Sequence, residues 1–115
     1  MKTSSERLAS GAWLVRVEGE ADFGTSPEME DALRVPLAEP RPRLLLDLSA
    51  LTYISSAGLR VLLRAHQRAS RAGGWLRLFG AQRGVTKVLD ETGLAGTLRM
   101  YASQGDAESA PEERE

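Results

Sequence analysis

Two neighbouring serines and a single histidine are the residues with which the chain could perform nucleophilic catalysis. A serine nucleophile needs a base within hydrogen-bond distance, and His66 is the only histidine. Ser56 and His66 fall on one expected helix, where ten residues at a rise of about 1.5 Å place them roughly 15 Å apart. The Gly-x-Ser-x-Gly turn of many hydrolases is missing as well. We therefore interpret His66 as a residue at the border of a buried helix face.

Three acidic residues, Glu18, Glu20 and Asp22, alternate with small or apolar residues. An extended backbone would present them on one side, where paired carboxylates could act as general acid and base. In so small a domain we favour a solvated strand end. The chain has no cysteine, no neighbouring ligands around its one histidine and no glycine-rich phosphate loop. We expect no enzyme, no cofactor and no metal.

Four arginines, Arg60, Arg64, Arg68 and Arg71, form a basic stripe on the same expected helix. A solvated helix face explains such a stripe, and among functional interpretations we favour a protein surface. Aromatic stacking groups are missing from it, and the net charge of −1 argues against holding nucleic acid by bulk charge. We expect no direct contact with nucleic acid.

These residues must be positioned by a fold of alternating strands and helices. The apolar pattern predicts strands at 7–9, 12–17, 43–48, 75–79 and 98–101, and helices at 27–38, 56–72 and 84–92. The run of Leu44, Leu45, Leu46 and Leu48 is typical of a strand covered on both faces. We predict an α/β domain with a mainly parallel sheet of four to five strands, an antiparallel pair at the N-terminal edge and about three helices.

The expected domain covers residues 1–103, and residues 104–115 carry five acidic side chains and one basic one. This acidic segment has no large apolar residue with which to offset its ordering entropy, so we expect it to be mobile. The first residues lead into no signal peptide, and no stretch approaches the length of a membrane span. We expect a cytoplasmic protein.

The segment 47–59 joins the expected buried strand to the long helix. Functional groups of parallel α/β sheets gather at the carboxyl ends of strands, and a helix N-terminus presents free N–H groups and partial positive charge. Simple capping of the helix by Ser55 or Ser56, worth about 1 kcal/mol, also explains a serine here.

Three motifs resemble those of the STAS domain family, the fold of bacterial anti-sigma factor antagonists. They are Gly19-Glu20-Ala21-Asp22, then Asp47-Leu48-Ser49 with Tyr53-Ile54-Ser55-Ser56-Ala57-Gly58-Leu59 and Val61-Leu62-Leu63, and finally Val88-Leu89-Asp90-Glu91-Thr92-Gly93-Leu94. Each motif is weak alone, but three in the right order and spacing are fairly specific. The resemblance covers residues 13–101, nearly the whole expected domain.

The resemblance implies a phosphorylation site. In the antagonists, the first serine of an Asp-Ser-Ser/Thr-Gly-Leu pattern is phosphorylated by an ATPase-fold serine kinase that is also the anti-sigma factor. Aligned through Gly58, that serine corresponds to Ser56. Ser55 replaces the family's aspartate and is a rival acceptor, and Ala57 replaces its second serine or threonine. Asp22 matches an acidic residue beside the phosphorylation loop that faces the kinase.

The resemblance therefore implies an anti-sigma factor antagonist that binds this kinase and is released by phosphorylation, with a phosphatase as a further candidate partner. The expected partner-binding residues are Asp22, Ser55, Ser56, Ala57, Gly58, Leu59, Arg60 and Arg64. Two alternatives stay open. The chain could be a constitutive STAS adaptor of a transporter or signalling complex, or a small nucleotide- or lipid-binding protein.

Overall fold

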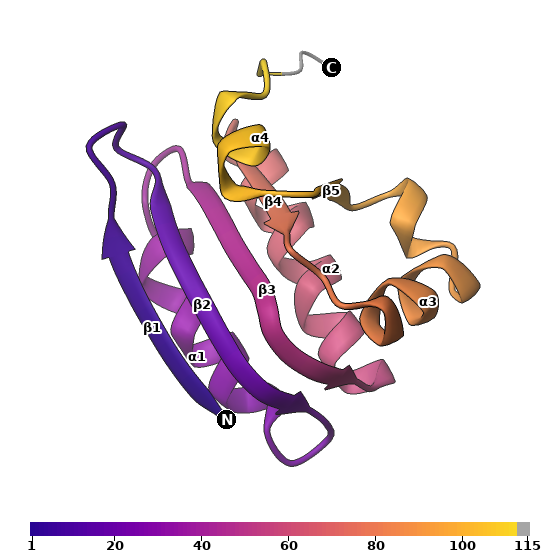
Figure 1. The fold of residues 1–115 in the computed structure, drawn as a ribbon. Coiled ribbons are helices and arrows are strands. Elements are labelled where there is room, and N and C mark those ends of the chain that lie inside the picture. Colours follow the sequence, from indigo (N-terminus) through magenta and orange to yellow (C-terminus); the bar gives the residue numbers. More distant parts are fainter. Residues whose placement is uncertain (113–115) are drawn as a thin grey trace.

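A five-stranded mixed sheet forms the centre of the computed structural model, which describes residues 1–112 (Figure 1). Its strands are β1 (Lys2–Arg7), β2 (Trp13–Ala21), β3 (Arg43–Ile54), β4 (Trp75–Phe79) and β5 (Arg99–Tyr101). They lie in the order β1-β2-β3-β4-β5, with β1 antiparallel to β2 and all other pairs parallel. The predicted α/β class, the mainly parallel sheet and the antiparallel edge pair are confirmed.

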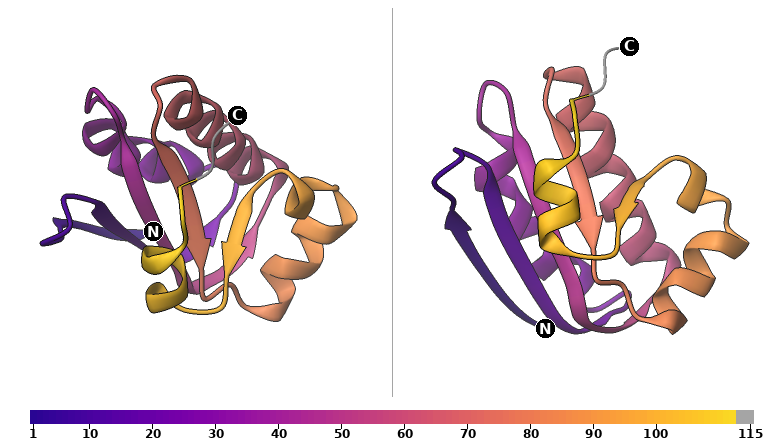
Figure 2. Two further views of the ribbon diagram at one scale, coloured as in Figure 1. Left: turned by 90° about the horizontal axis from the view of Figure 1, so that it is seen from above. Right: turned by 45° about the horizontal axis from the view of Figure 1, so that its top comes forward.

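Helices cover both faces of this sheet. The helical elements are α1 (Ser26–Leu37), α2 (Ser56–Arg71), α3 (Arg83–Glu91), the short 3-10 helix η1 (Leu94–Gly96) and α4 (Gln104–Ser109). Helices α1 and α2 lie side by side on one face, and α4 lies on the opposite face (Figures 1 and 2). Residues alternate accordingly: Leu44 and Leu46 join the core beneath the long helices, whereas Leu45 joins a smaller cluster with Ala107 of α4. Strand β3 is thus covered on both faces, as its leucine run predicts.

Strand β1 lies closer to the N-terminus than predicted. The predicted short strand at 7–9 overlaps β1 only at Arg7. The turn begins at Leu8, whose N–H donates to the Ala12 carbonyl at 2.8 Å and whose carbonyl accepts from the Gly11 N–H at 2.9 Å. Every residue of β1 is exposed. An edge strand bonded to one neighbour only needs no apolar face, so its polar sequence gave no periodic signal.

Strands β2 and β3 extend beyond the rest of the sheet. Strand β4 pairs with β3 only as far as Asp47, whereas the β2–β3 ladder continues to Ala21 opposite Ile54. The prediction that β3 ends near residue 48 is therefore wrong by six residues. Its apolar run stops at Leu48, but hydrogen bonds to β2 keep the backbone extended to Ile54. The end of this two-stranded ribbon leads directly into α2 (Figure 1).

Part of the acidic C-terminal segment, which the sequence predicts to be mobile, is helical in the structure. Residues 104–109 form α4, whose Ala107 is fully buried. The buried Arg77 of β4 donates from Nη1 to the Ala107 carbonyl at 2.9 Å and from Nη2 to the Pro111 carbonyl at 3.2 Å. Its guanidinium also stacks on the Trp75 ring, 3.8 Å from the centroid. The hydrogen bonds from Arg77 of β4 thus stabilise a segment that has no large apolar side chain of its own. Residues 113–115 lie outside the described part of the chain.

Candidate functional site

The β3–α2 junction is the place where the predicted site residues meet. The parallel register pairs Ala21 with Ile54, so the turn after β2 lies beside the start of α2. The Ser55 N–H donates to the Ala21 carbonyl at 2.8 Å and closes the ribbon. Asp22 and Ser56, separated by 34 positions in the sequence, therefore flank the same hydrogen-bonded corner.

Ser55 caps α2. Its backbone is extended, and its Oγ accepts a hydrogen bond from the Gly58 N–H at 3.4 Å. The same hydroxyl donates to the Ala21 carbonyl at 3.1 Å. The hydroxyl of Ser55 is half-buried and used on both sides, which is the capping arrangement that stabilises helix starts.

Ser56 occupies the first helical position and is exposed. Within residues 1–112, its Oγ makes no hydrogen bond. The first turn of α2 carries no acidic side chain, so the partial positive charge of the helix N-terminus is not offset there. A negative group added to this oxygen would gain from the helix dipole and would displace nothing in the fold.

Asp22 organises the turn that follows β2. Its Oδ1 accepts hydrogen bonds from the backbone N–H groups of Gly24 and Thr25, each at 2.9 Å. The Thr25 hydroxyl accepts from the Asp22 N–H at 2.9 Å and contacts the Glu20 carbonyl. The backbone N–H and the hydroxyl of Thr25 hold the pKa of Asp22 below its ordinary value. The carboxylate therefore favours its ionised form, in which it accepts the hydrogen bonds that hold the turn.

Gly58 and Leu59 face inward, although the sequence placed them among the partner contacts. A Cβ at Gly58 would lie 2.8 Å from Cγ1 of Ile54 and 2.9 Å from the Ala21 carbonyl oxygen. Leu59 is 7% exposed and belongs to the main core. Both residues pack at the inner side of α2, so they position the exposed residues at the start of the helix and are not themselves exposed to a partner.

Two exposed aromatic side chains near this junction were missed by the sequence analysis. Phe23, in the turn after Asp22, is 86% exposed, and Tyr53, near the end of β3, is 50% exposed. Phe23 lines a hollow of about 250 Å³ together with Ala57, Arg60 and Pro27. An aromatic residue between Asp22 and Gly24 in a polar turn is the signal that could have indicated it. Exposed aromatics of this kind are common at protein interfaces.

The predicted arginine stripe is divided by the structure. Arg60 is exposed, with no carboxylate of residues 1–112 within ion-pair distance. Arg64 Nη1 lies 3.7 Å from Oε2 of Glu30 on α1, and Arg68 Nε donates to the Leu37 carbonyl at 3.4 Å. Arg71, one turn further along α2, lines none of the hollows formed with α1. Three arginines thus face α1, and the fourth stands apart.

The remaining candidate chemistry finds little support in the described residues. Glu18 and Glu20 are exposed along β2, while Asp22 is turned into its loop, so the three carboxylates do not converge. His66 is half-buried on α2, as predicted. Residues 1–112 contain no group of three or more potential metal-ligating side chains. No helix in this part of the chain is long and apolar enough to cross a membrane.

Comparisons with known proteins agree with these features. The family model described as "STAS domain" matches residues 7–107. A Bacillus subtilis (strain 168) protein named anti-sigma-B factor antagonist is 31% identical over 88 residues, which cover 76% of this chain and 80% of the relative. The anti-sigma-F factor antagonist RsfB of Mycobacterium tuberculosis is 28% identical over 101 residues, covering 85% and 80%. The crystal structure of an anti-sigma factor antagonist from Mycobacterium paratuberculosis has a TM-score of 0.84 and 29% identity, covering 94% of this chain and 91% of that chain.

Proposed function

The chain belongs to the STAS domain family, and we propose that it is an anti-sigma factor antagonist controlled by phosphorylation of Ser56. In this role, the unmodified protein binds an anti-sigma factor that is also a serine kinase. Phosphorylation of Ser56 by that kinase releases the complex, and a phosphatase restores the binding form. The role is regulatory and requires no catalytic group of this chain.

The observation that carries the proposal is the difference between the two serines at the start of α2. Ser55 uses its hydroxyl to cap the helix and to bond Ala21, whereas the Ser56 hydroxyl is exposed and unengaged within residues 1–112. A kinase needs an accessible oxygen, and of these two serines it is Ser56 that offers one without breaking a hydrogen bond. The names of the relatives, which are similar over three quarters or more of this chain, support the antagonist role over an adaptor role.

The charge of a phosphate explains how release would work. A phosphoserine carries about −1.5 to −2 charges at neutral pH. An interface formed over a neutral hydroxyl would have to desolvate this charge, and a partner surface that supplies no cation for it makes the cost several kcal/mol. Since 1.4 kcal/mol is a factor of ten, about 4 kcal/mol would weaken binding roughly a thousandfold. The fold itself need not change.

Phosphate mapping tests the acceptor. The protein is incubated with its anti-sigma factor kinase and ATP, and the modified residue is identified by mass spectrometry. We expect the phosphate on Ser56, its loss in Ser56→Ala and its persistence in Ser55→Ala. A phosphate on Ser55 or elsewhere would refute the assignment.

A binding measurement tests the charge mechanism. We expect Ser56→Asp to weaken binding to the anti-sigma factor by a factor of at least about 100, with an unchanged circular dichroism spectrum. Ser56→Asn, of nearly the same size but neutral, is the matched control and should bind within a few-fold of the wild type. Equal affinities of the two variants would exclude release by charge. Retrieval of transport proteins and no kinase in a pull-down would favour the adaptor alternative.

A further inference from the structure

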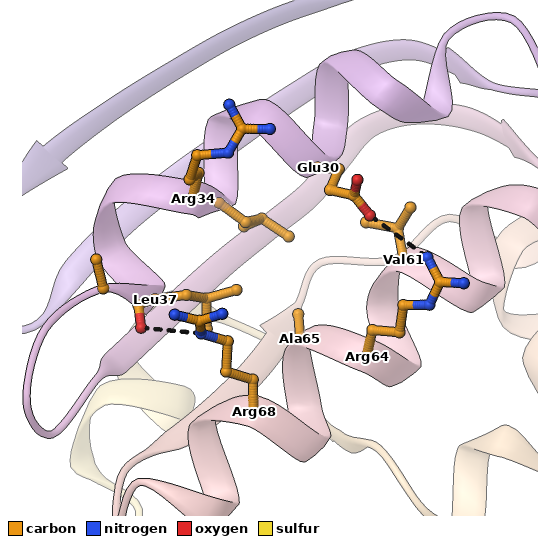
Figure 3. Close-up of a pocket in the computed structure, with 9 residues that line it drawn as sticks. Glu30, Arg34, Leu37, Val61, Arg64, Ala65 and Arg68 are labelled. Carbon is orange, nitrogen blue, oxygen red and sulfur yellow. Dashed lines mark hydrogen bonds and ion pairs between the residues drawn. The ribbon is translucent and has the colours of Figure 1, made fainter.

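A groove between α1 and α2 leads away from the Ser56 end of α2. It has a volume of about 310 Å³ and is lined by the side chains of both helices (Figure 3). Its apolar part consists of Leu33 and Leu37 from α1 and Val61 and Ala65 from α2. The hollow beside Phe23 continues it towards Ser56, because Glu30, Val61 and Arg64 line both.

The border of this groove is basic. Arg34 comes from α1, and Arg64 and Arg68 come from α2 (Figure 3); Arg60 continues the row in the adjoining hollow. Glu30 is the only acidic side chain among the residues that line the two hollows. Arg34 and Arg64 are 70% and 64% exposed in spite of their contacts with Asp31 and Glu30. Both side chains therefore remain largely exposed and accessible to an external anion.

The spacing of the arginines defines the shape of such an anion. Arg60, Arg64 and Arg68 follow one another at intervals of four residues, which places them about 6 Å apart along one side of α2. The row is therefore about 12 Å long. One small anion can reach only a single member, whereas a helix with acidic residues four apart presents carboxylates at the same interval.

We propose that this groove binds an acidic amphipathic helix of the protein's partner. Its apolar side chains would pack on Leu37 and Ala38, above the buried Leu33 and Val61, and its carboxylates would pair with the arginines on either side. Charge complementarity and an apolar floor together favour this occupant over a basic or wholly polar segment. The identity of the partner rests on the proposed function, but the chemistry of the helix follows from the groove.

The groove also leads to Ser56, the proposed phosphorylation site. Ala57 and Arg60 line the hollow at the Ser56 end, so a phosphate on Ser56 would stand at the end of the same basic row. Its negative charge would oppose an acidic segment that lies along this row.

A designed peptide tests the groove without a kinase. The probe is a labelled peptide of about four helical turns, with leucines on one face and glutamates four residues apart beside them. We expect saturable binding that weakens with added salt, with amide shifts in ¹H–¹⁵N spectra at Leu33, Leu37, Val61 and Ala65. A peptide with lysine in place of each glutamate should not bind.

Charge reversal on one helix supplies the matched comparison. Arg64→Glu and Arg68→Glu should each weaken peptide binding at least tenfold, whereas Arg71→Glu, the same change outside the groove, should alter it less than twofold. Equal losses in all three variants, or shifts on another face, would overturn the proposal. So would saturable binding of dodecanoate at these residues with no binding of the peptide, since the groove would then be a lipid site.

The two proposals can fail separately. If the peptide binds in the groove but Ser56 is not phosphorylated, the groove proposal stands and the proposed control by phosphorylation is wrong. Phosphorylation of Ser56 without peptide binding would do the reverse.

Discussion

The β3–α2 junction and the α4 contact treat their polar groups in opposite ways. At the junction, the Ser55 hydroxyl accepts a hydrogen bond from the Gly58 N–H, and the hydroxyl of Ser56 is exposed to solvent. On the other face of the sheet, the charged Arg77 is 1% exposed, and its guanidinium bonds the carbonyls of Ala107 and Pro111. The first arrangement leaves one exposed hydroxyl without a hydrogen bond within residues 1–112, and the second uses a buried cation to bind the carbonyls of a short helix and the residues after it.

This difference separates groups available for function from groups required for folding. A buried ion with hydrogen-bonded partners is costly to disturb, because removing it leaves polar atoms without water or partners. An exposed hydroxyl can be changed at little cost to stability. Substitutions in the two regions should therefore give effects on unfolding that differ by several fold.

Arg77→Ala should produce the largest loss of stability. The change leaves a cavity beneath α4 and removes the donors to two carbonyls, so we expect the free energy of unfolding to fall by about 3 kcal/mol. Urea denaturation measures the loss, and amide hydrogen exchange should accelerate in α4. Arg71→Ala, an exposed arginine, should change stability by less than about 0.5 kcal/mol. Similar losses in both variants would contradict the contrast.

Gly58→Ala should be the most damaging small change at the junction. The added methyl meets Ile54 and the backbone of Ala21 at less than 3 Å, so we expect a loss of about 1–3 kcal/mol despite the better helix propensity of alanine. Gly84→Ala in α3 is the matched control, because nothing lies within 4 Å of its added Cβ. It should be neutral or slightly stabilising in thermal denaturation. A stabilised Gly58→Ala would show that the corner between ribbon and helix is not tight.

The two serines provide the most direct comparison within one region. Ser55→Ala removes the cap of α2 and should lower the free energy of unfolding by about 1 kcal/mol. Ser56→Ala removes an unengaged hydroxyl and should change it by less than about 0.5 kcal/mol. Guanidinium denaturation of both variants under the same conditions measures the two losses of unfolding free energy. A larger loss for Ser56→Ala would mean that the structural hydroxyl has been assigned to the wrong residue.

Asp47 should give the smallest effect, through pH. Burial raises the pKa of this carboxyl, but hydrogen bonds from Ser49 and Arg16 outweigh it and hold the pKa below its ordinary value. A depressed folded-state pKa stabilises the protein above about pH 4, and this contribution is lost as the pH falls further through the folded-state value. Thermal unfolding between pH 6 and 2 should therefore show a flatter acid decline in Asp47→Asn. An unchanged decline would remove this carboxylate from the acid response.

Much of the fold could be predicted because apolar periodicity reports burial. The predicted strand 75–79 has the bounds of β4, and α2 ends at Arg71, one residue before the predicted end and shortly before the Gly73-Gly74 pair. Gly73 adopts φ +80°, the left-handed conformation expected of a residue just after a helix. These elements are fixed by local sequence and by one buried face.

The elements that were missed depend on partners far away in the sequence. Helix α4 turns only Ala107 into the core, and the arginine that holds it is 30 residues away. The last part of β3 is extended because β2 bonds it, not because its own residues alternate. The exposure of Ser56 could be anticipated from its helix position, but the groove could not, since it depends on how α1 packs beside α2.

The ion pair between Glu30 and Arg64 has a consequence for selectivity. The Glu30 carboxylate, 3.7 Å from Nη1 of Arg64, competes with a single external anion for that guanidinium. A ligand carrying several carboxylates in register can engage the neighbouring guanidinium groups first and then exchange with the Glu30 carboxylate. If the groove binds as proposed, its surface would favour an ordered series of carboxylates over a single acid.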